Sequence, residues 1–204
     1  MEKHAVIVVG GIPSVGKTSI SGFIARRFSI DMMLSTDYLR EFLRSAVSGD
    51  KKYDFLNISV YDAWKEFGDM TPENIVKGYL HQGELISRGM NSLIDRANKN
   101  GESLVIESLY FMPERLPSLK EPNVIPIYIQ VSDLGRYKEM VLERDKFTHP
   151  GQPGERLVPH IDAYRLMADE AIKTCRNNGI KVFDNLDYMK TRKEIAEFIE
   201  SRMK

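Results

Sequence analysis

Residues 5–19 read Ala-Val-Ile-Val-Val-Gly-Gly-Ile-Pro-Ser-Val-Gly-Lys-Thr-Ser, and this stretch decides the fold. Residues 5–9 form a short apolar run rich in β-branched side chains, which is typical of a buried strand in a parallel sheet. Residues 11–18 then match the phosphate-binding pattern G-x-x-x-x-G-K-S/T, and apolar residues at helical spacing follow from Thr18. The stretch therefore predicts a strand, a phosphate-binding loop and a helix in succession.

The loop offers ligands for a di- or triphosphate. Its glycines let the backbone wrap closely, so that backbone N–H groups point at the phosphates. We expect Lys17 to reach the β and γ phosphates, Thr18 to coordinate Mg²⁺ and Ser19 to bind the α phosphate. The alternative is a glycine-rich turn with an incidental lysine, but the flanking strand and helix favour a nucleotide site. The predicted nucleotide-binding set in this loop is Gly11, Ile12, Pro13, Ser14, Val15, Gly16, Lys17, Thr18 and Ser19.

The rest of the chain alternates between strand and helix patterns. Further strands are predicted at residues 30–34, 104–106, 124–131 and 180–183, and Pro126 moves the fourth strand toward a sheet edge. Helices are predicted at residues 18–27, 39–46, 71–98, 133–146, 159–177 and 192–203. Such alternation implies an α/β fold in which a five-stranded parallel sheet carries helices on both faces. We expect one domain over residues 1–204.

Composition and charge exclude several classes of protein. The 204 residues are 42% apolar and 28% charged, as in a globular protein with a real core. Lys+Arg and Asp+Glu number 29 each, and this zero net charge argues against a sequence-blind nucleic-acid binder. Cys175 is the only cysteine, so neither an intrachain disulfide nor a cysteine-rich metal site is expected. The short apolar run near the start predicts no signal peptide or membrane span, hence a cytoplasmic protein.

Among proteins with a phosphate-binding loop, the sequence favours a small-molecule kinase. A GTPase would carry Asp-x-x-Gly and Asn-Lys-x-Asp motifs, and neither occurs. A motor or transporter ATPase normally ends a strand in a pair of acids, whereas residues 104–107 supply only Glu107. Two alternatives stay open: a nucleotide-switched binding module, and a polynucleotide kinase, which would need a basic channel.

Such a kinase needs residues that hold and activate an acceptor hydroxyl. Asp37 follows the second predicted strand and is the candidate catalytic base or hydroxyl ligand, the alternative being a helix N-cap. Arg40 and Arg44 lie four residues apart on one helical face and could both bind an anionic acceptor, the alternative being a solvated face. Glu107 is expected to hold Mg²⁺ through water or to orient the acceptor.

A loop rich in proline and glycine at residues 148–154 predicts a mobile lid over about residues 144–157. Arg136, Arg144 and Arg156 surround it, and cations there would stabilise charge on the transferring phosphoryl group. We rank Arg144, as a catalytic and nucleotide-binding residue, and Arg156, as a substrate-binding residue, above Arg136. Asn185 follows the last strand and is expected to border the adenine.

The sequence resembles the archaeal 2-phosphoglycerate kinase family of P-loop kinases, which are related in fold to nucleoside-monophosphate kinases. The resemblance implies ATP and Mg²⁺ as cosubstrates, a small phosphorylated hydroxy-acid as acceptor, an acceptor-binding helical region at about residues 38–100, and a monomer or homodimer with no nucleic-acid or membrane partner. The matching blocks are residues 10–19, Ser35-Thr36-Asp37 with Arg40, Glu41 and Arg44, Ser59 with residues 61–64, residues 74–78 with Gln82, and residues 105–107.

Two departures distinguish the chain from that family. The family usually carries an additional N-terminal region, and it tends to follow the strand-end glutamate with Gly-Val-His, where this chain has Ser108-Leu109-Tyr110. A related branch lacks the extra region and phosphorylates mevalonate 3-phosphate to mevalonate 3,5-bisphosphate in an archaeal isoprenoid pathway. Its longer and more apolar acceptor suits the apolar residues 109–112. The resemblance therefore favours that branch, with 2-phosphoglycerate as the alternative acceptor.

Overall fold

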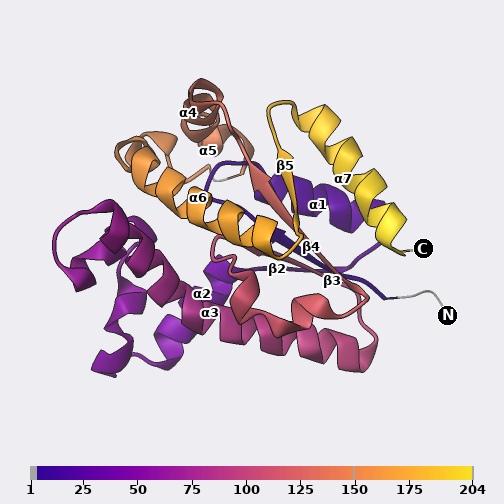
Figure 1. Cartoon of the computed structure of the whole chain (residues 1–204), viewed down its shortest axis with the longest axis horizontal. Helices are drawn as coiled ribbons and strands as arrows, with labels where there is room; N and C mark the ends of the chain where they lie inside the picture. Colours follow the sequence, from indigo (N-terminus) through magenta and orange to yellow (C-terminus); the bar gives the residue numbers. More distant parts are fainter. Residues whose placement is uncertain (1–3, 149, 204) are drawn as a thin grey trace.

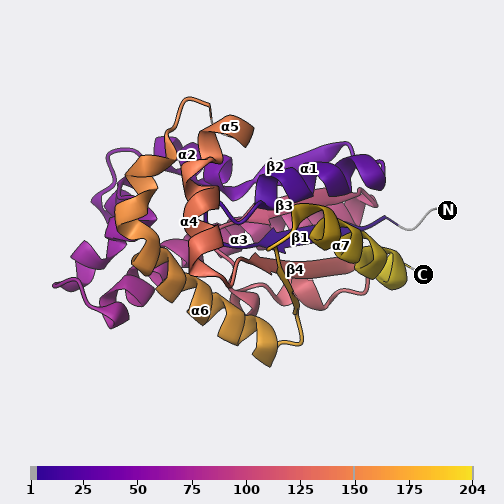
Figure 2. The ribbon, with the colours of Figure 1, turned by 90° about the horizontal axis from the view of Figure 1, so that it is seen from above.

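The computed structural model describes residues 4–148 and 150–203, and these contain one five-stranded parallel sheet. The strands follow one another in the order β2-β3-β1-β4-β5, and Figure 2 shows β2, β3, β1 and β4 side by side in this order. Their bounds are β1 (Val6–Gly10), β2 (Met32–Ser35), β3 (Leu104–Ser108), β4 (Val124–Gln130) and β5 (Lys181–Asp184). The connection after β1 runs to β2 on one side of the sheet, whereas the connection after β3 crosses to β4 on the other side of β1. Ligands of open α/β sheets bind at such a switch point.

Helices cover both faces of this sheet, which confirms the predicted three-layer fold. Figure 1 shows α1 (Lys17–Arg27) and α7 (Tyr188–Met203) on one side and α3 (Pro72–Asn100) on the other, where α3 contacts α6 (Ile161–Asn177). The central strand β1 is fully buried between these layers, as its run of valine and isoleucine predicts. The remaining helices are α2 (Thr36–Ala46), α4 (Leu134–Leu142) and α5 (Arg144–Phe147).

The long helix α3 begins and ends where its sequence signals lie. The Thr71 hydroxyl accepts a hydrogen bond from the Asn74 amide, Pro72 occupies the first helical position, and Gly101 ends the helix at φ 69°. The helix expected over residues 133–146 is instead divided into α4 and α5. The backbone of Gly154 packs directly on the Val141 carbonyl at the end of α4, where no side chain could fit.

Pro126 lies inside β4, which is an interior strand rather than an edge. The amide of Asn185 donates to the Gln130 carbonyl, so Gln130 turns its backbone toward β5, and Pro126, four residues earlier, faces the same way. Pairing with β5 begins only at Ile127 opposite Lys181. Pro126 thus lies before the paired part of β5, and its lack of a backbone N–H costs no hydrogen bond between the strands.

Residues 51–67 form two 3-10 helices, η1 (Lys51–Asn57) and η2 (Val60–Phe67), which Figure 1 shows on the side of the molecule away from both termini. The Asn74 side chain donates to the carbonyls of Phe67 and Asp69, and so fixes the end of η2 to α3. At Gly78 an added Cβ would lie 2.5 Å from the Ala63 carbonyl carbon, so α3 and η2 are in backbone contact. Three shorter 3-10 turns are η3 (Pro113–Arg115), η4 (Pro117–Lys120) and η5 (Gly154–His160).

Candidate active site

A pocket of about 590 Å³ opens beside the phosphate-binding loop, at the carboxyl ends of β1, β2 and β3. Five segments line it: the loop itself, the first turns of α2, the start of η2, the end of β3, and the region from Arg144 to Tyr164. These segments are distant in sequence and meet at the edge where parallel strands place their ligand sites. Of the predicted residues, the pocket brings together Lys17, Thr18, Asp37, Arg40, Glu107, Arg144 and Arg156.

The phosphate-binding loop is held in shape by side chains from other parts of the chain. Asn185 is buried and its Nδ2 donates to the Val15 carbonyl at 2.9 Å, while the Tyr137 hydroxyl donates to the Pro13 carbonyl at 3.0 Å. Gly16 has φ 91°, and a Cβ there would lie 2.5 Å from Asn185 Nδ2. The structure thus places Asn185 beneath the loop, with its amide N–H already used, rather than open to a base. Ser19 is not among the residues that line the pocket.

Lys17 is the first residue of α1, and its ammonium group sits within the loop. Its Nζ donates to the Ile12 carbonyl at 2.8 Å. Burial lowers the pKa of Lys17, and the nearby carboxylates of Glu107 and Asp37 oppose that shift. The cation is therefore poised between two acids, in a place where the phosphates of a nucleotide would compete for it.

Thr18, at the end of the loop, and Glu107, in β3, bring a hydroxyl and a carboxylate together. The Thr18 hydroxyl donates to Glu107 Oε1 at 3.2 Å, and Glu107 is only 7% exposed. The other carboxylate oxygen, Oε2, is buried with no partner in the described part of the chain. An unpaired buried carboxylate oxygen beside a hydroxyl fits Mg²⁺, which prefers oxygen ligands. Among the described residues no group of three or more His, Cys, Asp or Glu could hold a metal, so further ligands would come from phosphates and water.

The carboxylate of Asp37 faces the pocket and does not cap a helix. Ser35 takes the N-cap role, because its hydroxyl accepts from the Asp37 amide at 3.3 Å, and the neighbouring Thr36 hydroxyl donates to Ser108 Oγ at 3.1 Å. Within residues 4–148 and 150–203 no hydrogen-bond donor contacts the Asp37 carboxylate. Asp37 acts electrostatically on Lys17 and Arg144, so it lies between the phosphate loop and the expected lid.

Arg40 and Arg44 have different surroundings although they share a helical face. Arg40 lines the pocket, and its Nη2 donates to the carbonyls of Leu56 and Ile58 at 2.6 and 2.7 Å. Its Nε is buried with no partner among the described residues. Arg44 does not line the pocket; its guanidinium, 44% exposed, pairs with Glu41. The structure therefore does not bring both arginines to one anion, because α2 turns Arg44 toward its own acid.

The two lid arginines ranked highest face the pocket. Burial lowers the pKa of Arg144, and the nearby Arg156 lowers it further. Arg144 Nε is buried without a partner in the described part of the chain, while Arg156 is exposed. Arg136 instead pairs with Glu139 at 3.0 Å outside the pocket. Residue 149 of the expected lid lies outside the described residues.

Several aromatic residues at the pocket were not among the predicted site residues. Tyr61 of η2 stacks on His160 of η5 with ring centroids 3.8 Å apart, and Tyr164 meets Tyr61 edge-on at 6.1 Å. Tyr110, which follows β3, also lines the pocket. For Tyr61, a signal is the concentration of aromatic residues between positions 53 and 67, which is unusual for a segment without periodicity. No comparable local signal marks Tyr164. The Tyr61–His160 and Tyr61–Tyr164 contacts join η2 to η5 and α6.

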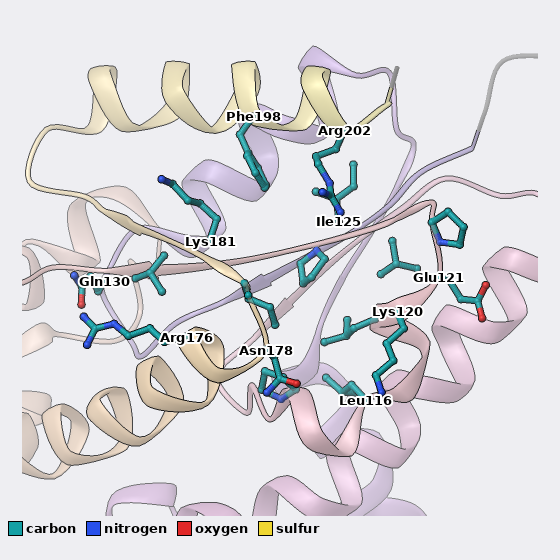
Figure 3. Close-up of a pocket in the computed structure, with 18 residues that line it drawn as sticks. Leu116, Lys120, Glu121, Ile125, Gln130, Arg176, Asn178, Lys181, Phe198 and Arg202 are labelled. Atoms are coloured by element: carbon teal, nitrogen blue, oxygen red, sulfur yellow. The ribbon is translucent and has the colours of Figure 1, made fainter.

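A second hollow, of about 890 Å³, lies at the other end of the sheet, near the start of β4 and β5. Figure 3 shows Phe198 and Arg202 of α7 on one side of it and Lys120 and Asn178 on the other. None of its lining residues belongs to the phosphate-binding loop or to a predicted site. The hollow is larger, but it lacks the groups that phosphoryl transfer needs.

Three features of this site define a P-loop kinase: the phosphate-binding loop with its lysine, the carboxylate beside a hydroxyl, and the arginines that face them. All three lie at the carboxyl edge of a parallel sheet. The chain is 42% identical over 192 residues to the mevalonate-3-phosphate 5-kinase of Thermoplasma acidophilum, and the match covers 94% of each chain. It belongs to the family of that kinase.

More distant relatives agree with this class. The chain is 28% identical over 201 residues to the 2-phosphoglycerate kinase of Methanocaldococcus jannaschii; the match covers 98% of the chain and 64% of that kinase. Among solved structures, a shikimate kinase from Acinetobacter baumannii superposes with a TM-score of 0.57 at 14% identity, covering 98% of this chain and 95% of that one, and shows the fold alone. No protein-family model matches the chain. No helix in the described part of the chain has the length and apolar character to span a membrane.

Proposed function

We propose that this kinase transfers the γ-phosphate of ATP to the primary hydroxyl of mevalonate 3-phosphate and so forms mevalonate 3,5-bisphosphate. The observation that carries the proposal is the composition of the 590 Å³ pocket, which joins a phosphate-binding loop to a wall with both cationic and apolar groups. The family relationship, at 42% identity over nearly the whole chain, supports this acceptor before others.

The acceptor's anionic groups meet cations on two sides of the pocket. Mevalonate 3-phosphate carries a carboxylate and a phosphate, and guanidinium groups recognise both by paired N–H donors. Arg40 presents a buried Nε without a partner among the described residues, and Arg156 faces the same pocket from η5. These two arginines are the proposed ligands of the carboxylate and the phosphate.

The apolar side chains that line the pocket favour mevalonate 3-phosphate over 2-phosphoglycerate. Val60, Leu109 and Leu157 line the pocket beside Tyr110. Mevalonate 3-phosphate has a methyl group and two methylenes more than the three-carbon glycerate, and apolar side chains gain by covering them. Phe111 and Met112 do not contribute, because both are buried in the core away from the pocket.

Each site residue is proposed to have its own role in the phosphoryl transfer. Asp37 is proposed to orient the primary hydroxyl and to accept its proton as the oxygen attacks phosphorus, while the bond to ADP breaks. Lys17 and Arg144 hold the phosphoryl oxygens as negative charge redistributes. Thr18 and Glu107 are proposed to hold Mg²⁺, which when bound neutralises charge on the β and γ phosphates.

Two regions are proposed to close over the nucleotide and to select the acceptor, respectively. Residues 144–157 act as a lid that brings Arg144 and Arg156 over the phosphates and excludes water. Residues 38–100 act as the acceptor-binding region, because α2 and the start of η2 line the pocket, while η1 packs on α2 and α3 packs on η2 behind them. The loop glycines and Asn185 serve the nucleotide, Asn185 by supporting the loop from below.

The direct test is ADP release with Mg²⁺ and ATP against mevalonate 3-phosphate, mevalonate, 2-phosphoglycerate, a nucleoside monophosphate and no acceptor. Turnover with mevalonate 3-phosphate alone is expected. Turnover with 2-phosphoglycerate instead would show that the apolar side chains of the pocket do not select the acceptor. ATP hydrolysis that no acceptor stimulates would overturn the assignment of the acceptor altogether.

A further inference from the structure

Gln82 is a buried polar residue that no step of the proposed reaction uses. It lies in the middle of α3 with no exposed surface. Burying an amide is unfavourable unless its donors and acceptor are all satisfied. Here Nε2 donates to the carbonyls of Phe55 and Ile58 at 2.6 and 2.8 Å, and Oε1 accepts from the Tyr110 hydroxyl at 2.8 Å. Both donor protons and the acceptor are therefore in use.

The carbonyls that Gln82 binds belong to residues 55–61, which we call the acceptor wall. η1 ends at Asn57, so the last carbonyls of this 3-10 helix have no partner further along their own helix. Arg40 from α2 takes the Leu56 carbonyl and shares the Ile58 carbonyl with Gln82. Side chains from two helices thus replace the hydrogen bonds that the backbone lacks.

The acceptor wall leads directly into the pocket. Ser59, Val60 and Tyr61, the residues after the clamped carbonyls, all line it, as do Arg40 and Tyr110. Gln82 itself does not line the pocket. Its side chain hydrogen-bonds to both sides of the proposed acceptor site: to the Ile58 carbonyl in the acceptor wall and to the Tyr110 hydroxyl after β3. The Ile58 carbonyl also accepts a hydrogen bond from Arg40.

We propose that Gln82 is a positioning residue that sets the affinity for the acceptor without contacting it. Its amide fixes the spacing between the acceptor wall and Tyr110, and with it the direction of the Arg40 guanidinium, whose Nη2 is committed to the same carbonyl. The inference rests on the proposed function, because it assumes that the acceptor occupies this side of the pocket. A buried amide whose donors and acceptor are all paired specifies one arrangement of its partners, and that arrangement is lost when the amide is removed.

Three variants divide the network. Gln82→Met keeps the volume and removes all three bonds, Gln82→Glu keeps the shape but turns both donors into an acceptor facing two carbonyls, and Tyr110→Phe removes only the bond to Oε1. The matched control is Gln130→Met, on β4 and outside the acceptor pocket. With mevalonate 3-phosphate, Gln82→Met and Gln82→Glu are expected to raise the acceptor KM tenfold or more, with the ATP KM within twofold of wild type. Tyr110→Phe is expected to fall between them and the control.

A purely structural role would give a different pattern. Loss of folded enzyme lowers kcat and leaves both KM values unchanged, and that result, or a parallel rise in both, would overturn the proposal. A second measurement does not depend on the acceptor: hydrogen exchange in Gln82→Met should quicken at least tenfold at residues 58–62 and stay unchanged at residues 11–18. Unchanged exchange at the wall would refute the proposal even if wild type used another acceptor. If wild type used no acceptor but the exchange pattern appeared, the proposed function would fail and the positioning of the wall would stand.

Discussion

Replacement of Asp37 by asparagine tests the proposed chemistry with little disturbance of the fold. The side chain is exposed in the pocket, and its carboxylate has no hydrogen-bond partner among the described residues, so an amide of the same shape leaves no donor unpaired. The helix keeps its cap, because Ser35 binds the residue 37 amide and not its side chain. The loss of one acid from the first turn of α2 costs about 0.3–1 kcal/mol of stability through the helix dipole.

The cost to catalysis should be much larger. A positioned general base contributes roughly 10²- to 10⁴-fold, which corresponds to about 2.7–5.5 kcal/mol of barrier. Asp37 also supports the charge of Lys17, since its carboxylate raises the pKa of that lysine against the effect of burial. We therefore expect kcat for ADP release to fall by at least a hundredfold, while thermal unfolding and nucleotide affinity change little.

The assay is steady-state ADP release at saturating ATP and mevalonate 3-phosphate, with nucleotide binding measured separately by titration. Asp31→Asn is the matched control, because Asp31 is an exposed acid just before β2 that does not line the pocket. It should retain wild-type turnover. If Asp37→Asn kept kcat within about threefold of wild type, neither the basicity nor the charge of Asp37 would matter for turnover, and its role would be limited to orienting the hydroxyl.

Three further outcomes follow from the site and the core. Glu107→Gln should raise the Mg²⁺ concentration for half-maximal activity about tenfold, since it removes the carboxylate charge beside Thr18; an unchanged Mg²⁺ titration would remove Glu107 from the metal site. Arg44→Ala should leave the acceptor KM within about twofold, because Arg44 does not line the pocket and its guanidinium is paired with Glu41; a large rise would restore it as an acceptor ligand. Burial raises the pKa of the Cys175 thiol to about 12. At a pH of about 8, below the pKa of a free thiol, native Cys175 should therefore react with iodoacetamide about a thousandfold more slowly than in urea, and equal rates would show that Cys175 is accessible.

The elements of the fold could be predicted because their signals are local. The apolar run of β1, the glycines of the loop and the Thr71-Pro72 start of α3 each act within a few residues, and the structure has the corresponding elements at those places. The family could be predicted for the same reason, since its motifs are short contiguous blocks. Residues 51–67 could not, because 3-10 helices held by side chains of α2 and α3 leave no period in their own sequence.

The site was harder to predict from the sequence than the fold, for a different reason. Arg40 and Arg44 share the spacing that predicts a common target, but spacing does not reveal that Glu41 lies beside Arg44 while carbonyls of a distant turn lie beside Arg40. Asn185 follows a strand as a base-binding residue would, yet the close approach of Gly16 directs its amide to the Val15 carbonyl. Both outcomes depend on contacts between segments far apart in the chain.

The backbone contact between Gly78 and Ala63 has a consequence for how this enzyme could change its substrate. The proposed acceptor-binding region is supported from behind by a glycine, so each atom added at position 78 would press on the backbone of η2 rather than fill empty space. The breadth of the acceptor pocket could then be altered from a face that never meets solvent or ligand. A lineage could pass from a long acceptor to a short one through small side chains at position 78, with Asp37, Lys17 and the arginines untouched.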